Sequence, residues 1–183
     1  MLDGIRTPDS RYIIVRGRLW RATNPLLAEG ERTGWVGELM NARRAMGRAR
    51  KTGDAEAGRA ARLTVDEAKR ALGERGDVWW TDGTPDQNRR LVTSTSYREW
   101  YSRAQQNVSA ILRLLDARAE EASICPSEVA RAEYARDWRG HMAEVRDAAR
   151  HLARRGVVAI TQRGKALDPD KAFRGPIRLR RRL

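Results

Sequence analysis

The C-terminal half of the chain constrains the fold most, because its apolar and turn-forming residues follow one another in a distinctive order. Helical spacing of apolar residues predicts a long helix over about residues 97–119. Pro126 suits the first position of a short second helix. A third helix is expected over residues 138–155, with Asp137 as its N-cap and Gly156 directly after its end. These residues therefore predict three consecutive helices.

Strand patterns follow the third predicted helix. The β-branched run of residues 157–161 predicts a strand, and Arg163-Gly164 is expected to form a hairpin tip. Gly175-Pro176 introduces a last strand over residues 177–180, where apolar and basic residues alternate. Helices followed by such a hairpin have the order of a winged helix-turn-helix, which is the fold that we expect for residues 107–183.

The third predicted helix carries a row of basic residues beside its apolar stripe. At 100° per residue, the following four fall within about 80° of one another: Arg139, Arg146, Arg150 and Arg154. Such a row suits a recognition helix, whose side chains meet phosphates and guanine edges in the roughly 12 Å wide major groove. Glu144 and Asp147 are expected elsewhere on the helix. The alternative interpretation is an ordinary solvated helix face.

Further basic residues occur in the predicted strands and loops, where residues 157–183 contain eight basic and two acidic residues. We expect phosphate contacts from five of them: Arg163, Lys165, Arg174, Arg178 and Arg180. The wing is either the tip at residues 162–165 or the longer loop at residues 168–174. Wings commonly touch the minor groove or the DNA backbone. A merely solubilising tail is the alternative interpretation of residues 180–182.

Several different short motifs are distributed along this half of the chain. They are residues 124–131, Trp138-Arg139, Val145-Arg146, Gly156, residues 161–164 and residues 175–179. Together they resemble a small bacterial winged helix-turn-helix domain family of unknown function, over residues 107–181. The resemblance covers under half of the chain. It implies the fold, and DNA binding by analogy with winged helices in general, although a fold alone does not determine function.

The N-terminal part, residues 1–106, resembles no family that we recognise. Residues 11–22 hold two apolar runs around a glycine, which predicts a β-hairpin. Apolar residues at helical spacing predict a helical hairpin over residues 35–50 and 55–72, with a capping box that allows a restart at Thr64. The expected fold is therefore mainly α with small β elements, in which one long helix joins this part to the C-terminal domain.

The charge of the whole chain favours a polyanionic partner. Lys and Arg total 37 against 24 acidic residues, which gives a formal net charge of +13. The preference for Arg over Lys suits bidentate contacts with phosphate and guanine. It also follows from high-GC codon usage, so the excess over acids is the stronger observation.

A loop in the N-terminal part is the strongest alternative site. It places two tryptophans, Trp79 and Trp80, beside five polar residues: Asp82, Asp86, Asn88, Arg89 and Arg90. Two acids, an amide and two guanidiniums suit a phosphate or a metal. The same residue types form structured turns packed by tryptophan, which is the interpretation that we favour. Stacking of single-stranded nucleic acid on the tryptophans is a third interpretation.

Other chemistry finds little support. His141 and His151 lie ten residues apart on one predicted helix and Cys125 is the single cysteine, so we expect no metal site, no disulfide and no cofactor. Cys125 suits a small buried residue better than a thiol sensor. No phosphate-cradling glycine loop and no Ser-His-Asp elbow occurs. We therefore do not expect an enzyme.

The expected partner is double-stranded DNA, bound by a non-catalytic cytoplasmic protein such as a transcriptional regulator. No apolar run has the length of a membrane span, and the first residues lack an apolar signal core, so no membrane partner is expected. One alternative is a protein-interaction module, in which the winged helix and the Trp-rich N-terminal region dock a partner or a second copy. Another alternative is a binder of RNA or single strands.

Overall fold

The computed structural model describes residues 2–119 and 121–182. The chain forms two compact units, one of residues Arg6–Leu91 and one of residues Met1–Ile5 with Val92–Leu183. We call them the arm unit and the C-terminal unit. The boundary expected at residues 106 and 107 falls inside a helix of the C-terminal unit.

A short β-hairpin in the arm unit confirms the first strand prediction. β1 (Tyr12–Val15) pairs antiparallel with β2 (Arg18–Arg21). Arg16 and Gly17 in the turn have φ values of 51° and 72°, the left-handed conformations that a two-residue hairpin turn favours. The inward face is made of buried residues: Tyr12, Ile14, Leu19 and Arg21.

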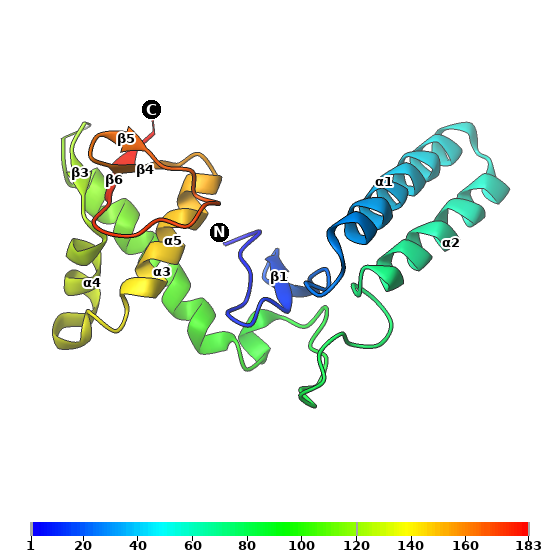
Figure 1. Cartoon of the computed structure of the whole chain (residues 1–183), viewed down its shortest axis with the longest axis horizontal. Helices are drawn as coiled ribbons and strands as arrows, with labels where there is room; N and C mark the ends of the chain where they lie inside the picture. The colour runs from blue at the N-terminus through cyan, green and yellow to red at the C-terminus, as the bar shows by residue number, and fades with distance from the viewer. Residues whose placement is uncertain (1, 120, 183) are drawn as a thin grey trace. The chain divides into compact units, whose positions relative to one another are not determined.

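A helical hairpin follows, as the apolar spacing predicts. Figure 1 shows α1 (Glu29–Thr52) and α2 (Ala55–Ala71) side by side and joined by a tight turn. Gly53 ends α1 with a φ of 73°, and the Asp54 side chain accepts a hydrogen bond from the main-chain N–H of Ala57. The buried residues between the helices are mostly small: Leu39, Ala42, Ala49, Gly58, Ala61 and Ala68. Small residues allow the two helix backbones to approach closely.

Two details of the predicted helical hairpin are wrong. α1 begins at Glu29 rather than at residue 35, because Glu29 and Glu31 stabilise the positive end of a helix whose first turns are rich in glycine. α2 continues through Thr64 without a restart. The Thr64 hydroxyl donates to the carbonyl of Ala60 inside the helix, so it does not cap a new one.

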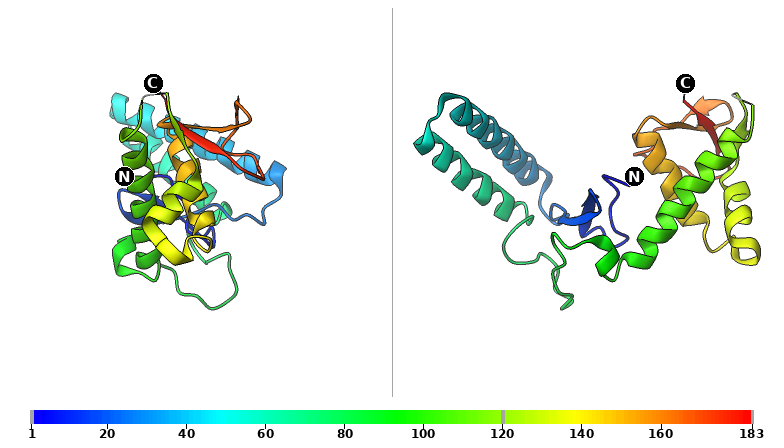
Figure 2. Two further views of the ribbon diagram at one scale, coloured as in Figure 1. Left: turned by 90° about the vertical axis from the view of Figure 1, so that its left-hand side faces the viewer. Right: turned by 180° about the vertical axis from the view of Figure 1, so that it is seen from behind.

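The C-terminal unit consists of three helices and one small sheet. Its elements are a 3₁₀ turn (Val92–Ser94), α3 (Arg98–Asp116), β3 (Ser123–Ile124), α4 (Pro126–Tyr134), a second 3₁₀ turn (Ala135–Asp137), α5 (Met142–Arg154), β4 (Val158–Gln162), β5 (Lys165–Ala166) and β6 (Arg178–Arg181). The antiparallel sheet has the strand order β3-β6-β4-β5. Figure 2 shows the three helices packed together with the sheet beside them.

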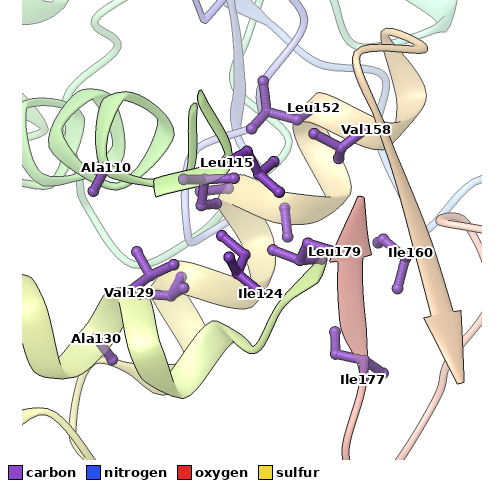
Figure 3. Close-up of a cluster of buried hydrophobic side chains, with 14 residues drawn as sticks. Ala110, Leu115, Ile124, Val129, Ala130, Leu152, Val158, Ile160, Ile177 and Leu179 are labelled. Carbon is purple, nitrogen blue, oxygen red and sulfur yellow. The ribbon is translucent and has the colours of Figure 1, made fainter. Parts of the chain in front are cut away.

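One hydrophobic core holds this unit together (Figure 3). The three helices and the strands β3, β4 and β6 supply buried side chains to it: Leu115 from α3, Ile124 from β3, Val129 from α4, Leu152 from α5, Ile160 from β4 and Leu179 from β6. Burying a side chain of this size contributes about 1.5–3 kcal/mol relative to exposure. The core therefore fixes the short strands against the helices.

The last helix begins later than predicted. α5 starts at Met142, and Asp137 lies in the preceding 3₁₀ turn rather than at an N-cap. The main-chain N–H of Gly140 donates to the Asp137 carbonyl at 3.1 Å, which closes a turn before the helix. Glycine disfavours a helix interior, so the helical pattern is interrupted there. Arg139 consequently precedes α5 instead of lying on it.

The fold class is confirmed at the level of a mainly helical chain with small antiparallel sheets. α3 spans most of the helix predicted over residues 97–119 but ends at Asp116. Pro126 is the first residue of α4, as predicted. Among the residues described, none of the helices has the length and apolar character needed to cross a membrane.

Candidate nucleic-acid interface

The hairpin tip expected to contact phosphates is present in the C-terminal unit. β4 and β5 pair antiparallel, with Gln162 opposite Lys165. Arg163 and Gly164 form the two-residue turn, with φ values of 51° and 80°. Arg163 and Lys165 are exposed, and neither side chain has a hydrogen bond or ion pair with a residue that the structure describes.

The long loop, residues 168–176, is ordered by hydrogen bonds to itself and to β4. Asp168 accepts a hydrogen bond from the main-chain N–H of Asp170 at 2.9 Å. Gln162 on β4 donates from Nε2 to the carbonyls of Arg174 at 2.7 Å and Pro176 at 2.9 Å. The loop is therefore held from the side of the sheet.

Two arginines of α5 hold the same loop from the side of the helix. Arg150 donates from Nη1 to the carbonyls of Pro169 and Lys171, at 2.9 Å in each case. Arg146 donates from Nη1 and Nη2 to the carbonyl of Gly175, at 3.2 and 3.3 Å. Hydrogen bonds from a charged donor are stronger than those between neutral groups. The two side chains are half-buried in this position.

Phe173 adds to the contacts that attach the long loop to α5. The guanidinium carbon atoms of Arg150 and Arg146 lie 4.0 and 5.3 Å from the centre of its ring. Each contact of this kind contributes about 0.5–1 kcal/mol at a partly exposed site. Phe173 is the only phenylalanine of the chain. The loop thus presents one aromatic ring to the arginines and keeps its other large side chains outside.

The last arginine of the row is also engaged, whereas Asp147 on the same helix is not paired with it. Arg154 forms an ion pair with Asp170, with 2.7 Å between Nε and Oδ1. The pKa of Asp147 is raised, because loss of solvent outweighs the lowering effects of Arg150 and Arg154. Asp147 is still exposed at the surface and forms no ion pair with this row among the described residues.

The sequence suggests a row of arginines on α5 without partners in the protein, whereas the structure gives three of these arginines internal partners. Arg146 and Arg150 bind main-chain carbonyls, and Arg154 binds a carboxylate. A guanidinium has five N–H donors, so these contacts do not exhaust it. Arg154 uses only Nε, and its side chain is 50% exposed.

Arg139 lies in the turn before α5 and is exposed. Its guanidinium carbon is 4.5 Å from the centre of the Trp138 ring, and that of Arg131 on α4 is at the same distance. The half-buried Trp138 thus contacts two cations. The Arg139 side chain has no hydrogen bond or ion pair within the described residues.

The two arginines predicted as phosphate contacts on β6 differ in their partners. Arg178 donates to the hydroxyl of Ser123 at 3.0 Å and lies 3.4 Å from a carboxylate oxygen of Glu128. It therefore ties β6 to β3 and to the start of α4. Arg180 is exposed and has no side-chain partner within the described part of the chain.

Several exposed cations of this unit have no side-chain hydrogen bond or ion pair within residues 2–119 and 121–182, and five of them belong to the strands and loops after α5. These five lie at the β4–β5 tip, on the long loop and on β6. We call them the wing patch: Arg163, Lys165, Lys171, Arg174 and Arg180. Four of the five are phosphate contacts predicted from the sequence, and Lys171 is an addition.

The acidic loop of the arm unit is bound to the β-hairpin. Asp86 accepts hydrogen bonds from Arg21 at 2.5 Å and from the Tyr12 hydroxyl at 2.9 Å. Asp82 forms an ion pair with Arg11. Arg11 holds the pKa of Asp82 at about 2, and burial raises the pKa of Tyr12 to about 12. Each of the two acids thus has a guanidinium partner.

The tryptophans beside this loop use their indole N–H groups internally. Trp79 donates to the carbonyl of Ala22 at 3.2 Å, and Trp80 donates to the carbonyl of Thr84 at 2.7 Å. Asn88 accepts from the main-chain N–H of Arg21 at 3.1 Å. The geometry is that of a structured turn folded onto β1 and β2.

The candidate metal and redox residues His141 and Cys125 make contacts within the fold. His141 stacks on Tyr134 with ring centres 3.8 Å apart and lies 3.4 Å from carboxylate oxygens of Asp137 and Glu144. Cys125 occupies the N-cap position of α4. No group of three or more His, Cys, Asp or Glu side chains suited to a metal occurs among the residues described.

Sequence reasoning missed the role of the long loop as the partner of α5. The relevant residues are Phe173 and Asp170, which contact Arg150 and Arg154. A lone phenylalanine in an otherwise polar loop was the available sign, because a large apolar side chain there needs a surface to cover it. Main-chain carbonyl acceptors leave no such sign in a sequence.

Comparison with known proteins gives a family for part of the chain. Residues 104–182 match the family described as a protein of unknown function (DUF3253), which is less than half of the chain. A search among curated proteins found no match. The C-terminal segment is thus similar to an uncharacterised family, as its motifs indicate.

Proposed function

We propose that the C-terminal unit is a winged helix-turn-helix that binds double-stranded DNA without catalysis, as a transcriptional regulator does. The order of elements supports this proposal. In it, α3, α4 and α5 are the three helices, β3 is the strand after the first helix, and β4 to β6 form the wing. The strand order β3-β6-β4 joins the short first strand to the last one.

The wing patch is the observation that carries the proposal. Its five cations have no anionic partner within the described residues, and they belong to consecutive parts of one hairpin. Phosphates are the partners that unpaired surface cations of this kind attract, with release of counterions. Contacts to phosphates position a protein on a duplex without reading its sequence.

The arginines of α5 have two roles in this proposal. Arg146 and Arg150 hold the long loop so that Lys171 and Arg174 face solvent. Arg154 and Arg139 reach phosphates or base edges with their remaining donors when α5 enters the major groove. Arg178 contributes mainly by holding β6 in place.

Binding of the full chain to a random-sequence duplex at several salt concentrations tests the proposal. We compare the triple variant Arg163→Gln, Lys165→Gln, Arg174→Gln with a control of equal charge loss in the same unit. The control changes three arginines that form ion pairs: Arg113, Arg118 and Arg181. Each lost phosphate contact lowers the slope of log affinity against log salt by about 0.9, so the triple variant is expected to lose about two to three.

Equal slopes in the two variants would contradict the proposal, as would affinity that does not respond to salt. Tighter binding to a single strand or an RNA duplex than to duplex DNA would show that duplex DNA is not the preferred partner. Thermal unfolding of each variant verifies that it is folded.

A protein-binding module is the second candidate, and exposed apolar residues of the arm unit favour it. Leu26 is 80% exposed, and Trp20 on β2 is 41% exposed. Tryptophan is enriched among the residues that contribute most to protein interfaces, and an exposed leucine of the same unit adds apolar contact area. Co-purification with a defined protein, without retention on DNA at about 0.15 M salt, would favour this module. Sedimentation of the purified chain tests for a homodimer.

A further inference from the structure

Charge is segregated along the helical hairpin of the arm unit. The tip, residues 41–64, contains seven basic and two acidic residues. The other end of the hairpin, residues 27–40 and 65–77, contains four basic and seven acidic residues. One element therefore has a basic end and an acidic end, which high-GC codon usage does not explain.

The basic residues at the two ends also differ in their partners. At the acidic end all four are in ion pairs: Arg32 with Glu29, Lys69 with Glu74, and Arg70 and Arg75 with Asp66. At the tip all seven are exposed and none forms an ion pair within the described residues: Arg43, Arg44, Arg48, Arg50, Lys51, Arg59 and Arg62. The tip thus keeps its cations available to an outside anion.

Three of these arginines border a groove along one flank of the hairpin tip. Arg43, Arg50 and Arg62 line a groove of about 600 Å³. Small residues of both helices form part of its lining: Gly47, Ala49 and Gly58. The lining also includes Asp54, whose carboxylate accepts the capping hydrogen bond at the start of α2. Arg43 and Arg50 are seven residues apart on α1, close to two turns, so they lie on the same flank about 10 Å apart along the helix axis. The small residues leave room for a ligand between the guanidiniums.

The residue types in the tip distinguish between polyanions. Residues 41–64 contain no aromatic residue, so bases have no ring on which to stack. The turn at residues 51–55 contains no large apolar residue that would enter a lipid surface, and the exposed apolar side chains of the tip, Met46 and Leu63, lie away from it on the two helices. Six of the seven cations are arginines, whose planar fork matches phosphate oxygens. Backbone phosphates of a nucleic acid fit these properties best.

We propose that the tip of the α1/α2 hairpin is a second nucleic-acid contact, in which Arg43, Arg50 and Arg62 bind backbone phosphates of a duplex independently of sequence. The contact lies in the arm unit (Figure 1) and does not require the wing patch to bind DNA. It gives the hairpin a function as a basic arm.

The test uses the full chain and a 30-base-pair random-sequence DNA duplex, with affinity measured from low to about 0.3 M salt. The tip variant is Arg43→Gln, Arg50→Gln, Arg62→Gln. The matched control is Arg32→Gln, Arg70→Gln, Arg75→Gln, which removes the same charge from the other end of the same hairpin. The tip variant is expected to lose about two to three from the salt slope and at least about tenfold in affinity at 0.15 M salt. The control is expected to keep the slope.

Circular dichroism and thermal unfolding show whether both variants are folded. An unchanged slope in a folded tip variant overturns the proposal, and so does an equal loss in the control. Vesicles of phosphatidylcholine with phosphatidylglycerol serve as a second probe. Loss of vesicle binding with unchanged duplex binding would also overturn it, in favour of a lipid surface. The wing-patch variant is measured in parallel, so the two proposals can fail separately.

Discussion

Two helical segments of this protein carry similar rows of arginine and use them differently. On α5, Arg146, Arg150 and Arg154 bind carbonyl and carboxylate oxygens of the long loop between β5 and β6. At the tip of α1, Arg43 and Arg50 have no such partner within the described residues. The first row stabilises the fold of its own unit, and the second has no such structural role.

The difference teaches that a row of arginines on a helix is not by itself an interface. What distinguishes the two rows is the supply of oxygen acceptors nearby. The long polar loop after β5, residues 168–176, packs against α5, whereas α1 is followed by a tight turn at Gly53. The number of oxygen acceptors near a row of arginines therefore decides which guanidiniums stay unpaired. Substitutions in the two rows test this difference.

The largest expected effect concerns Arg21, a buried arginine whose Nη1 and Nη2 atoms bind main-chain carbonyls and Asp86. Arg21→Met leaves Asp86 without its guanidinium and removes donors from the carbonyls of Gly76 and Asp77. Because the Asp86 side chain is 32% exposed, the cost comes mainly from the main-chain carbonyls that lose a charged donor. Several such losses together lower the free energy of unfolding by about 3 kcal/mol or more. Arg48→Met at the exposed tip is expected to change it by about 0.5 kcal/mol or less. Chemical denaturation of both variants measures the difference, and equal losses would break the comparison.

An intermediate effect is expected when α5 releases the long loop. Arg150→Ala removes two hydrogen bonds to carbonyls and the contact with Phe173, which costs about 2 kcal/mol of local stability. Amide hydrogen exchange in residues 168–176 should accelerate by about thirtyfold, and trypsin should cleave after Lys171 more readily. Arg50→Ala is the control, and it should leave exchange in its own hairpin unchanged. Unaltered exchange in the loop would remove the structural role of the α5 row.

The smallest effect concerns acid stability and the exposed pair of Arg11 and Asp82. The pKa of Asp82 is lowered from 3.8 to about 2, first by the hydrogen bond from Arg11. A lowered pKa means that the pair stabilises the fold above about pH 4, and that this contribution is lost as the pH falls through 2. Asp82→Asn should therefore lower the Tm at pH 5 and have no effect near pH 2. A difference in Tm that stays constant with pH would contradict the assignment.

Much of the arm unit could be predicted from local patterns. The turn at Arg16 and Gly17 and the cap at Gly53 and Asp54 act through backbone geometry over a few residues, and such features are visible in a sequence. The extra turns at the start of α1 were missed because glycines weaken the helical pattern there.

In the C-terminal unit, local patterns predict the order of the elements but not all of their contacts. The order of its elements and the tip at Arg163 follow from periodicity and turn chemistry. The start of α5 was misplaced because Trp138 fits the apolar stripe but packs beside Arg131 and Arg139 in a turn. The use of Arg150 depended on main-chain oxygens brought near by tertiary folding, which no spacing rule reveals.

The long loop is anchored by its main-chain oxygens, and this has a consequence for how the protein can change. Every amino acid carries a carbonyl group, so Arg146 and Arg150 grip the loop whatever side chains stand at most of its positions. Only Phe173 and Asp170 contribute through their own side chains. Positions such as 171 and 174 are free to vary, and evolution can retune the outer surface of the loop for a new ligand without rebuilding its attachment.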